Sequence, residues 1–206
     1  MTTLPENFKE LSYILDKKFN FKNILIVNTP ITGHFLNEMF LEERTTRLVY
    51  NHNNYNEFVE TITNINKKFD LICVDPYHEY KESISSFRLF TLLLNDDGIL
   101  ISHDCNPPTF ESSSHIYKQG EWCGVTYAAF IEIAYNNPDW YYAIINKDYG
   151  LGIISKKQTE FVKKIINREK QKIFLDMFKE KKYKEAYNYF NNHSNDIINL
   201  ISKFTS

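Results

Sequence analysis

Two patterns of apolar residues alternate along the chain. In the first, short runs rich in Ile, Leu and Val continue without interruption, at residues 23–28, 46–50, 69–75 and 99–103. Such runs are typical of strands that are buried on both faces of a parallel sheet. In the second pattern, apolar residues recur every three or four positions, as in amphipathic helices, at residues 7–18, 35–40, 54–66, 79–94 and 125–136. The alternation predicts an α/β fold, Rossmann-like and doubly wound, with a mostly parallel sheet.

Two connections between these elements are short. Residues 95–98, Asn-Asp-Asp-Gly, predict a turn between a helix and the strand that begins at residue 99. Two further apolar runs, at residues 140–146 and 150–155, are joined by residues 147–149 alone. That connection is too short for a helical crossover, so we expect an antiparallel hairpin near the end of the sheet.

The composition changes at residue 157. The remaining sequence is rich in Lys and Glu, lacks Pro and Gly, and places apolar residues such as Phe161 and Ile165 one helical turn apart. We therefore expect a Rossmann-like domain over residues 1–156 and two or three amphipathic helices over residues 157–206. These helices would pack on the body, form a homodimer contact or act as a substrate lid.

Composition and charge narrow the classes of partner. Hydrophobic residues make up 43% of the chain, enough for a folded core, while the net charge is −2 and the pI about 6.3. Without an excess of basic residues, nucleic acid is not an expected partner. No apolar run approaches the roughly 18 residues that span a bilayer, and the N-terminus lacks a signal-peptide pattern. Three widely spaced cysteines favour a reducing compartment. We expect a cytoplasmic protein that binds a small molecule.

Polar side chains follow two of the predicted strands at the point where each strand ends. Asp75 ends one strand and is followed closely by His78, and His103 and Asp104 end the next strand along the chain. Ligands of open parallel sheets bind beyond the carboxyl ends of the strands. If these two strands are neighbours, the four side chains converge at one edge of the sheet.

Such a group of residues has two chemical uses. Asp75 and Asp104 could hold a divalent cation through oxygen ligands, with the Asn106 amide as a neutral third ligand. Alternatively, the carboxylates could orient a histidine, His78 or His103, that removes a proton as a general base. A purely structural role is the third interpretation, because an Asp after a strand often caps the following helix or turn.

The same residues carry a resemblance to a known family. The segments "FDLICVDPYHEY" and "FRLFTLLLNDDGILISHDCNPP" resemble the second half of class I S-adenosylmethionine-dependent methyltransferases. They are similar in particular to a bacterial branch with D-x-x-H-x-Y and H-D-C-N-P-P elements, whose members often accompany polysaccharide and natural-product genes. The segment "GEWCGVTYAAFIEIAYNNPDWYYAIINKDYGLGII" continues the match, so that the resemblance covers roughly residues 69–155.

The resemblance implies a cofactor and a set of residues that would hold it. S-adenosylmethionine would lie against Asn28, Thr29, Thr32, Asn51 and Asp75. In this respect the chain departs from the family: the turn after the first strand has no glycine before residue 33, the second strand ends in Asn51 where the family has an acid, and the following segment is too short for a third strand. By the same resemblance, Asp75 and Asp104 fall where catechol-type relatives keep Mg²⁺-binding carboxylates.

The function predicted from these features is S-adenosylmethionine-dependent O-methylation of a small polar acceptor, such as a sugar, a nucleotide-sugar or a capsule polysaccharide intermediate. His78 or His103 would act as the base, and Asp75 and Asp104 would orient it or bind Mg²⁺ or another divalent cation. Two alternatives stay open. The fold could have lost the cofactor and perform metal-assisted or acid–base chemistry on a sugar or phosphate substrate, or it could serve as a non-catalytic partner subunit.

Overall fold

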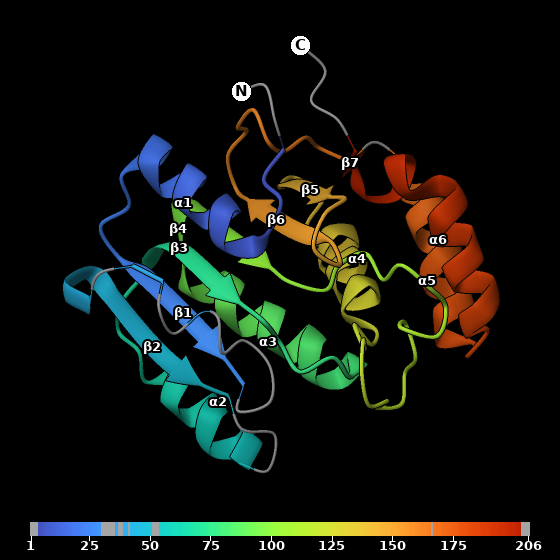
Figure 1. Cartoon of the computed structure of the whole chain (residues 1–206), viewed down its shortest axis with the longest axis horizontal. Coiled ribbons are helices and arrows are strands. Elements are labelled where there is room, and N and C mark those ends of the chain that lie inside the picture. The colour runs from blue at the N-terminus through green and yellow to red at the C-terminus, as the bar shows by residue number, and fades with distance from the viewer. Residues whose placement is uncertain are drawn as a thin grey trace.

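The computed structural model describes residues 4–29, 36, 39–40, 42–50, 54–165 and 167–202. Its centre is a seven-stranded sheet with the strand order β2-β1-β3-β4-β6-β5-β7 (Figure 1). The strands are β1 (Ile24–Asn28), β2 (Thr45–Val49), β3 (Phe69–Val74), β4 (Leu94–Ser102), β5 (Tyr141–Ile145), β6 (Leu151–Ser155) and β7 (Leu200–Ile201). The helices are α1 (Phe8–Phe19), α2 (Tyr55–Thr63), α3 (Tyr80–Leu93), α4 (Thr126–Asn136), α5 (Arg168–Lys179) and α6 (Tyr183–Ile198), and a 3-10 turn, η2, spans Glu42–Arg44.

The pairing of the strands confirms the predicted fold class. Strands β2, β1, β3 and β4 run parallel to one another, while β6 pairs antiparallel with both β4 and β5. The register of the central pair sets Val74 opposite Ser102. Residue 75 therefore leaves the sheet beside residue 103, and the two strand ends that carry polar side chains are neighbours.

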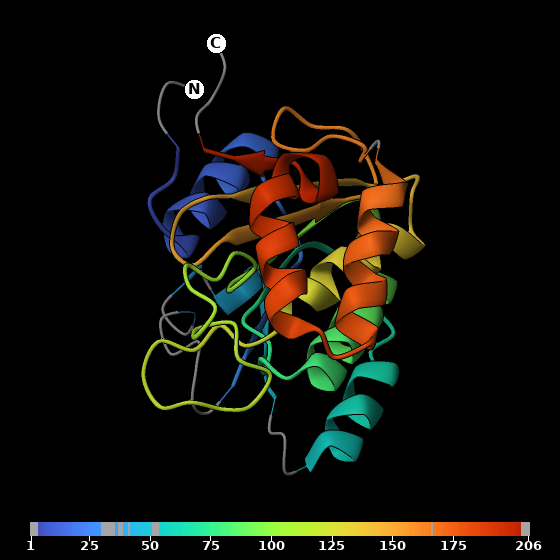
Figure 2. The same cartoon turned by 90° about the vertical axis from the view of Figure 1, so that its right-hand side faces the viewer.

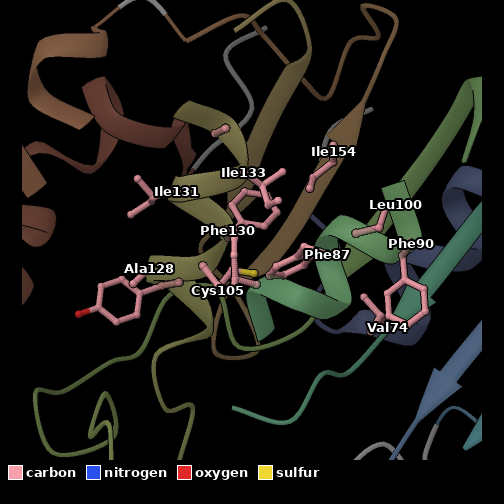
Figure 3. Close-up of a cluster of buried hydrophobic side chains, with 14 of the residues drawn as sticks. Val74, Phe87, Phe90, Leu100, Cys105, Ala128, Phe130, Ile131, Ile133 and Ile154 are labelled. Atoms are coloured by element: carbon pink, nitrogen blue, oxygen red, sulfur yellow. The ribbon is translucent and has the colours of Figure 1, made fainter. Parts of the chain in front are cut away.

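Helices cover both faces of the sheet. On one face α1 buries Phe8, Leu11 and Leu15 against apolar side chains of the central strands. On the other face α2, α3 and α4 share a second core with the sheet, part of which appears in Figure 3, where Phe87 of α3 and Phe130 of α4 lie beside one another. The layered arrangement explains why the central strands are apolar without interruption.

The last two helices lie outside α4. They run side by side as a pair (Figure 2) and pack on α4. The buried rings of Phe174 in α5 and Phe190 in α6 contact Tyr127 of α4. After α6, β7 returns to the sheet and pairs with β5. No helix among the described residues is both long and apolar enough to cross a membrane.

Two local predictions were wrong. Residues 95–98 are part of β4 rather than a turn: Phe69 pairs with Leu94 and Leu71 with Ile99, so the extra residues of β4 are accommodated as a bulge. Phe161 and Ile165 precede α5 and are not helical, because Lys163 pairs with Tyr142 across the end of β5. The predicted helix at residues 35–40 lies mostly outside the described residues, and between β2 and β3 the described part of the chain has α2 but no strand.

Candidate functional site

Backbone hydrogen bonds hold Asp75 and His103 at the ends of β3 and β4. The Asp75 N–H donates to the Val27 carbonyl at 3.2 Å, and the His103 N–H donates to the Val74 carbonyl at 3.2 Å. Both residues are thus held by the last rungs of the parallel ladder. Their side chains, together with that of Asp104, stand at the carboxyl edge of the sheet, where open α/β sheets bind ligands.

His78 turns back from the start of α3 towards these carboxylates. Its Nε2 atom lies 3.0 Å from Asp104 Oδ2 and 3.4 Å from Asp75 Oδ1. Its other ring nitrogen, Nδ1, donates to the Trp122 carbonyl at 2.6 Å. Because Nδ1 is occupied as a donor, Nε2 is the atom that faces both carboxylates. One ligand atom from each of Asp75, His78 and Asp104 lies within 4.8 Å of the others, close enough to hold one metal ion.

Both ring nitrogens of His103 face carboxylates. Nδ1 lies 3.0 Å from Asp104 Oδ2, and Nε2 lies 3.3 Å from Asp148 Oδ2. Asp148 comes from the connection between β5 and β6, and the same oxygen accepts a hydrogen bond from the Phe8 N–H at 2.9 Å. Asp148 therefore ties the β4 end to α1. Sequence reasoning did not assign it to the site, although it forms part of the D-Y-G element.

We call Asp75, His78, His103, Asp104 and Asp148 the charged rim. Four of its members are buried, with 3% of His78, 2% of Asp75, 9% of His103 and 5% of Asp104 exposed, whereas Asp148 is half-buried. Three carboxylates and two imidazoles lie in contact here, away from most of the solvent, where electrostatic interactions are stronger than in water.

The pKa values of the charged rim reflect this contact. Burial alone would lower the pKa of an imidazole, yet Asp104 and Asp75 outweigh burial and raise the pKa of His78 to about 10. The pKa of His103 also lies well above its ordinary value, against the effect of burial, chiefly because of Asp104. Burial would raise the pKa of Asp104, but the two imidazoles hold it far below its usual range. The surrounding carboxylates thus favour the protonated form of both histidines.

Backbone conformations that favour glycine surround the charged rim. Gly124 has φ +56, and a Cβ atom there would lie 2.2 Å from the His78 carbonyl oxygen. That carbonyl accepts a hydrogen bond from the Val125 N–H at 2.9 Å. Asp104 itself has φ 60, a left-handed conformation that is strained for a residue with a side chain. The close approach at Gly124 lets the loop before α4 seat Trp122 against His78, with ring centroids 5.1 Å apart.

The remaining predicted residues fall in three groups. Asn28 and Thr29 are buried at the end of β1, on the same edge of the sheet as Asp75. Thr32 and Asn51 lie outside the described residues. The Asn106 amide donates to Asn146 Oδ1 at 2.8 Å, and no hydrogen bond within the described part of the chain joins it to Asp75 or Asp104.

Cysteine and aromatic residues complete the site. Burial raises the pKa of the Cys105 thiol well above its ordinary value, which disfavours the thiolate form that a nucleophile needs. Tyr77 and Trp122 lie edge to face with centroids 5.8 Å apart, and Tyr117 contacts the same indole at 5.1 Å. Trp122 was not predicted as part of the site; its proximity to His78 depends on a loop that the sequence pattern does not place.

The chain was compared with protein families, curated proteins and solved structures. No family model and no curated protein matches its sequence. Among solved structures it is similar to a Staphylococcus aureus protein provisionally assigned as a caffeoyl-CoA O-methyltransferase, with a TM-score of 0.51, 16% identity and coverage of 75% of this chain and 86% of that one. It is similar to a Klebsiella pneumoniae protein provisionally assigned as an O-methyltransferase, with a TM-score of 0.50, 12% identity and coverage of 74% and 81%. The chain therefore has the Rossmann-like fold of class I S-adenosylmethionine-dependent methyltransferases.

Proposed function

We propose that the protein is a cytoplasmic S-adenosylmethionine-dependent O-methyltransferase whose acceptor is a small polar molecule, such as a sugar, a nucleotide-sugar or a capsule intermediate. The observation that carries the proposal is the convergence of Asp75, His78 and Asp104 at the carboxyl edge of a methyltransferase-type sheet. Residues 1–156 would supply the catalytic domain, and residues 157–206 a helical extension.

The cofactor would lie across the ends of β1, β2 and β3. Asn28 and Thr29 stand at the first of these strand ends and Asp75 at the third, and Thr32 and Asn51 follow β1 and β2 in the sequence. Tyr50 adds an observation in favour: its hydroxyl is buried and has no hydrogen-bond partner among the described residues. A buried polar group without a partner is costly, and an adenosine group at the end of β2 would supply one.

The charged rim fits a divalent cation as well. Asp75 and Asp104 offer carboxylate oxygens and His78 offers Nε2, while the bond from Nδ1 to the Trp122 carbonyl orients the imidazole, as outer partners of metal-binding histidines do. The three carboxylates of the charged rim could balance the charge of a divalent cation that takes the place of the His78 proton. An imidazole ligand suits Mn²⁺, Fe²⁺ or Zn²⁺ better than Mg²⁺, which prefers oxygen.

The bound cation would lower the pKa of an acceptor hydroxyl and so favour its ionised form. The residues themselves would orient the acceptor and manage its proton. When Nε2 of His78 holds the cation it carries no proton, and His103 would be the residue that takes up the acceptor proton. Without a cation, Nε2 of His78, which faces Asp104 at 3.0 Å, would take this role. Burial of the charged rim would exclude water and hold acceptor and methyl group in line, which supplies much of the rate enhancement.

Binding of the cofactor tests the proposal directly. Isothermal titration of the folded protein with S-adenosylmethionine and S-adenosylhomocysteine should give saturable binding. Asp75→Asn should weaken it by about tenfold or more, since a hydrogen bond to a charged group contributes about 1.5–3 kcal/mol. Asp97→Asn, at an exposed position in the bulge of β4, is the matched control. The absence of heat at millimolar cofactor, with a folded circular-dichroism spectrum, would overturn the methyltransferase proposal.

Metal content distinguishes the second candidate function. The Asp75, His78 and Asp104 donor set also favours metal-assisted chemistry on a sugar or phosphate substrate without a methyl donor. Elemental analysis after dialysis against Mn²⁺ or Zn²⁺ should find metal in the wild type and in Asp97→Asn but not in Asp104→Asn. Metal binding without cofactor binding would favour the second candidate, and the loss of both would leave the role of a partner subunit.

A further inference from the structure

A cavity of about 400 Å³ lies next to the charged rim, between the start of α3, the loop before α4 and the turn that joins α5 to α6. We call it the α3–α6 cavity. Its lining includes Glu79, the residue after His78, and Val125, whose N–H donates to the His78 carbonyl. Its volume is within the range of small-molecule sites, roughly 300–1,000 Å³.

Aromatic rings form much of the wall. Tyr80 and Phe178 lie 5.0 Å apart between ring centroids, and Phe178 and Tyr183 lie 5.2 Å apart. His115, from the loop before α4, stacks on Tyr183 at 4.2 Å. The Tyr80 hydroxyl donates to Glu132, which fixes the orientation of that ring. Fixed rings of this kind offer flat faces to a ring-shaped ligand at a low cost in side-chain entropy.

Charged side chains of both signs line the cavity, with Glu79 and Glu82 on the wall formed by α3. Lys81, Lys179 and Lys181 form no ion pair with any described residue, whereas Lys182, on the same turn, pairs with Glu180. These three lysines point to a ligand that bears an anionic group.

We infer that the α3–α6 cavity binds a phosphate-bearing ring compound: the ring stacks on Tyr183 and Tyr80, and the phosphate contacts Lys179 and Lys181. This inference rests on the proposed function, in that the ligand would be the part of the acceptor remote from the methylated oxygen. A sugar phosphate and a nucleotide share this chemistry. The turn between α5 and α6 would then contribute to the specificity for the acceptor.

Binding without cofactor tests this inference separately. Isothermal titration at low salt would use glucose 1-phosphate and uridine monophosphate as probes, with glucose and uridine as their uncharged counterparts. At least one phosphorylated probe should bind at least about fivefold more tightly than its uncharged counterpart, a difference of about 1 kcal/mol. Tighter binding of glucose 1-phosphate would identify the sugar phosphate as the source, and tighter binding of uridine monophosphate the nucleotide.

Charge reversal locates the phosphate. Lys181→Glu should weaken the binding of the phosphorylated probe by about tenfold, since an attractive charge becomes a repulsive one. Lys184→Glu, at an exposed residue of α6 that does not line the cavity, should change the affinity for this probe by less than about twofold. The inference is overturned if neither phosphorylated probe binds, or if both substitutions have the same effect. Failure of cofactor binding alone would overturn the methyltransferase proposal and leave this result intact.

Discussion

The charged rim and the α3–α6 cavity lie side by side, but they differ in how their charged side chains are paired. In the charged rim every imidazole contacts at least two carboxylates, and most of the atoms are buried. In the cavity three lysines have no ion-pair partner within the described residues, and they are exposed. The first region is therefore assembled before any ligand arrives, whereas the second has charges available for a ligand to pair.

The difference has an energetic meaning. Burial of paired charges gains little net stability, because desolvation offsets much of their attraction, but removal of one partner leaves the others buried and uncompensated. Exposed lysines stay solvated, so they contribute little to the free energy of folding in either direction. We therefore expect substitutions of the buried members of the charged rim to destabilise the protein strongly and substitutions in the cavity to affect ligand binding alone.

The largest effect is expected from Gly124→Ala. Its methyl group would lie 2.2 Å from the His78 carbonyl oxygen, so the loop before α4 must move away from the charged rim. We expect a loss of at least about 3 kcal/mol in the free energy of unfolding, measured in urea. The control is Gly120→Ala, at φ +104 with open space around the new methyl group, which should lose about 1 kcal/mol from backbone strain alone. Equal losses would contradict the close packing at Gly124.

Asp104→Asn should have the next largest effect. The substitution removes the carboxylate that lies 3.0 Å from both His78 and His103, whereas Asp75 lies 3.4 Å and 3.9 Å from them. Breaking a buried charge pair costs about 3–5 kcal/mol, and the amide retains part of the hydrogen bonding, so we expect a loss of about 3 kcal/mol. Asp148→Asn, at a half-buried carboxylate, should lose about 1 kcal/mol. A larger loss for Asp148→Asn than for Asp104→Asn would show that the centre of the network was misplaced.

The stability of the metal-free protein should depend on pH. His78 has a pKa of about 10 in the folded protein, because Asp104 and Asp75 outweigh the opposing effect of burial, against about 6.5 when unfolded. Its contribution is complete below about pH 6.5 and is lost as the pH rises towards 10. We expect the free energy of unfolding to fall by about 1 kcal/mol per pH unit for this imidazole in that window, in urea titrations with a chelator present. His78→Gln should reduce the slope, and an unchanged slope would contradict the assignment.

The smallest effect on stability is expected in the cavity. Lys179→Ala and Lys181→Ala remove charges that pair with no described residue, so the free energy of unfolding should stay within about 0.5 kcal/mol of the wild type. The same variants should bind phosphorylated probes less tightly. A clear loss of stability in either variant would show that these lysines support the fold, and the contrast between the two regions would disappear.

The meeting of two polar strand ends at one edge of the sheet could be predicted from local pattern. Continuous apolar runs identified β3 and β4, and the position of Asp75 and His103 at their ends followed from strand-end geometry once the two strands were neighbours. Asp148 and Trp122 were missed because their contacts join segments far apart in the sequence. The role of Asn106 as a ligand stays a prediction, and the hydrogen bond from its Nδ2 atom to Asn146 also joins segments far apart in the sequence.

The errors in secondary structure have the same physical origin. The spacing of Phe161 and Ile165 is compatible with a helix, yet pairing of Lys163 with Tyr142 draws this segment against β5. Likewise, the polar residues at 95–98 predicted a turn, while pairing of Leu94 with Phe69 extends the strand backward through a bulge. In both segments tertiary pairing overrides a short local pattern.

A crystal structure of the protein soaked with S-adenosylhomocysteine would test the central claim most directly. We predict density for the ligand across the carboxyl ends of β1 and β3, with its sulfur atom facing Asp75, His78 and Asp104. Density confined to the α3–α6 cavity, or none at the sheet edge in crystals soaked to saturation, would contradict the assignment of the charged rim as a methyl-transfer centre.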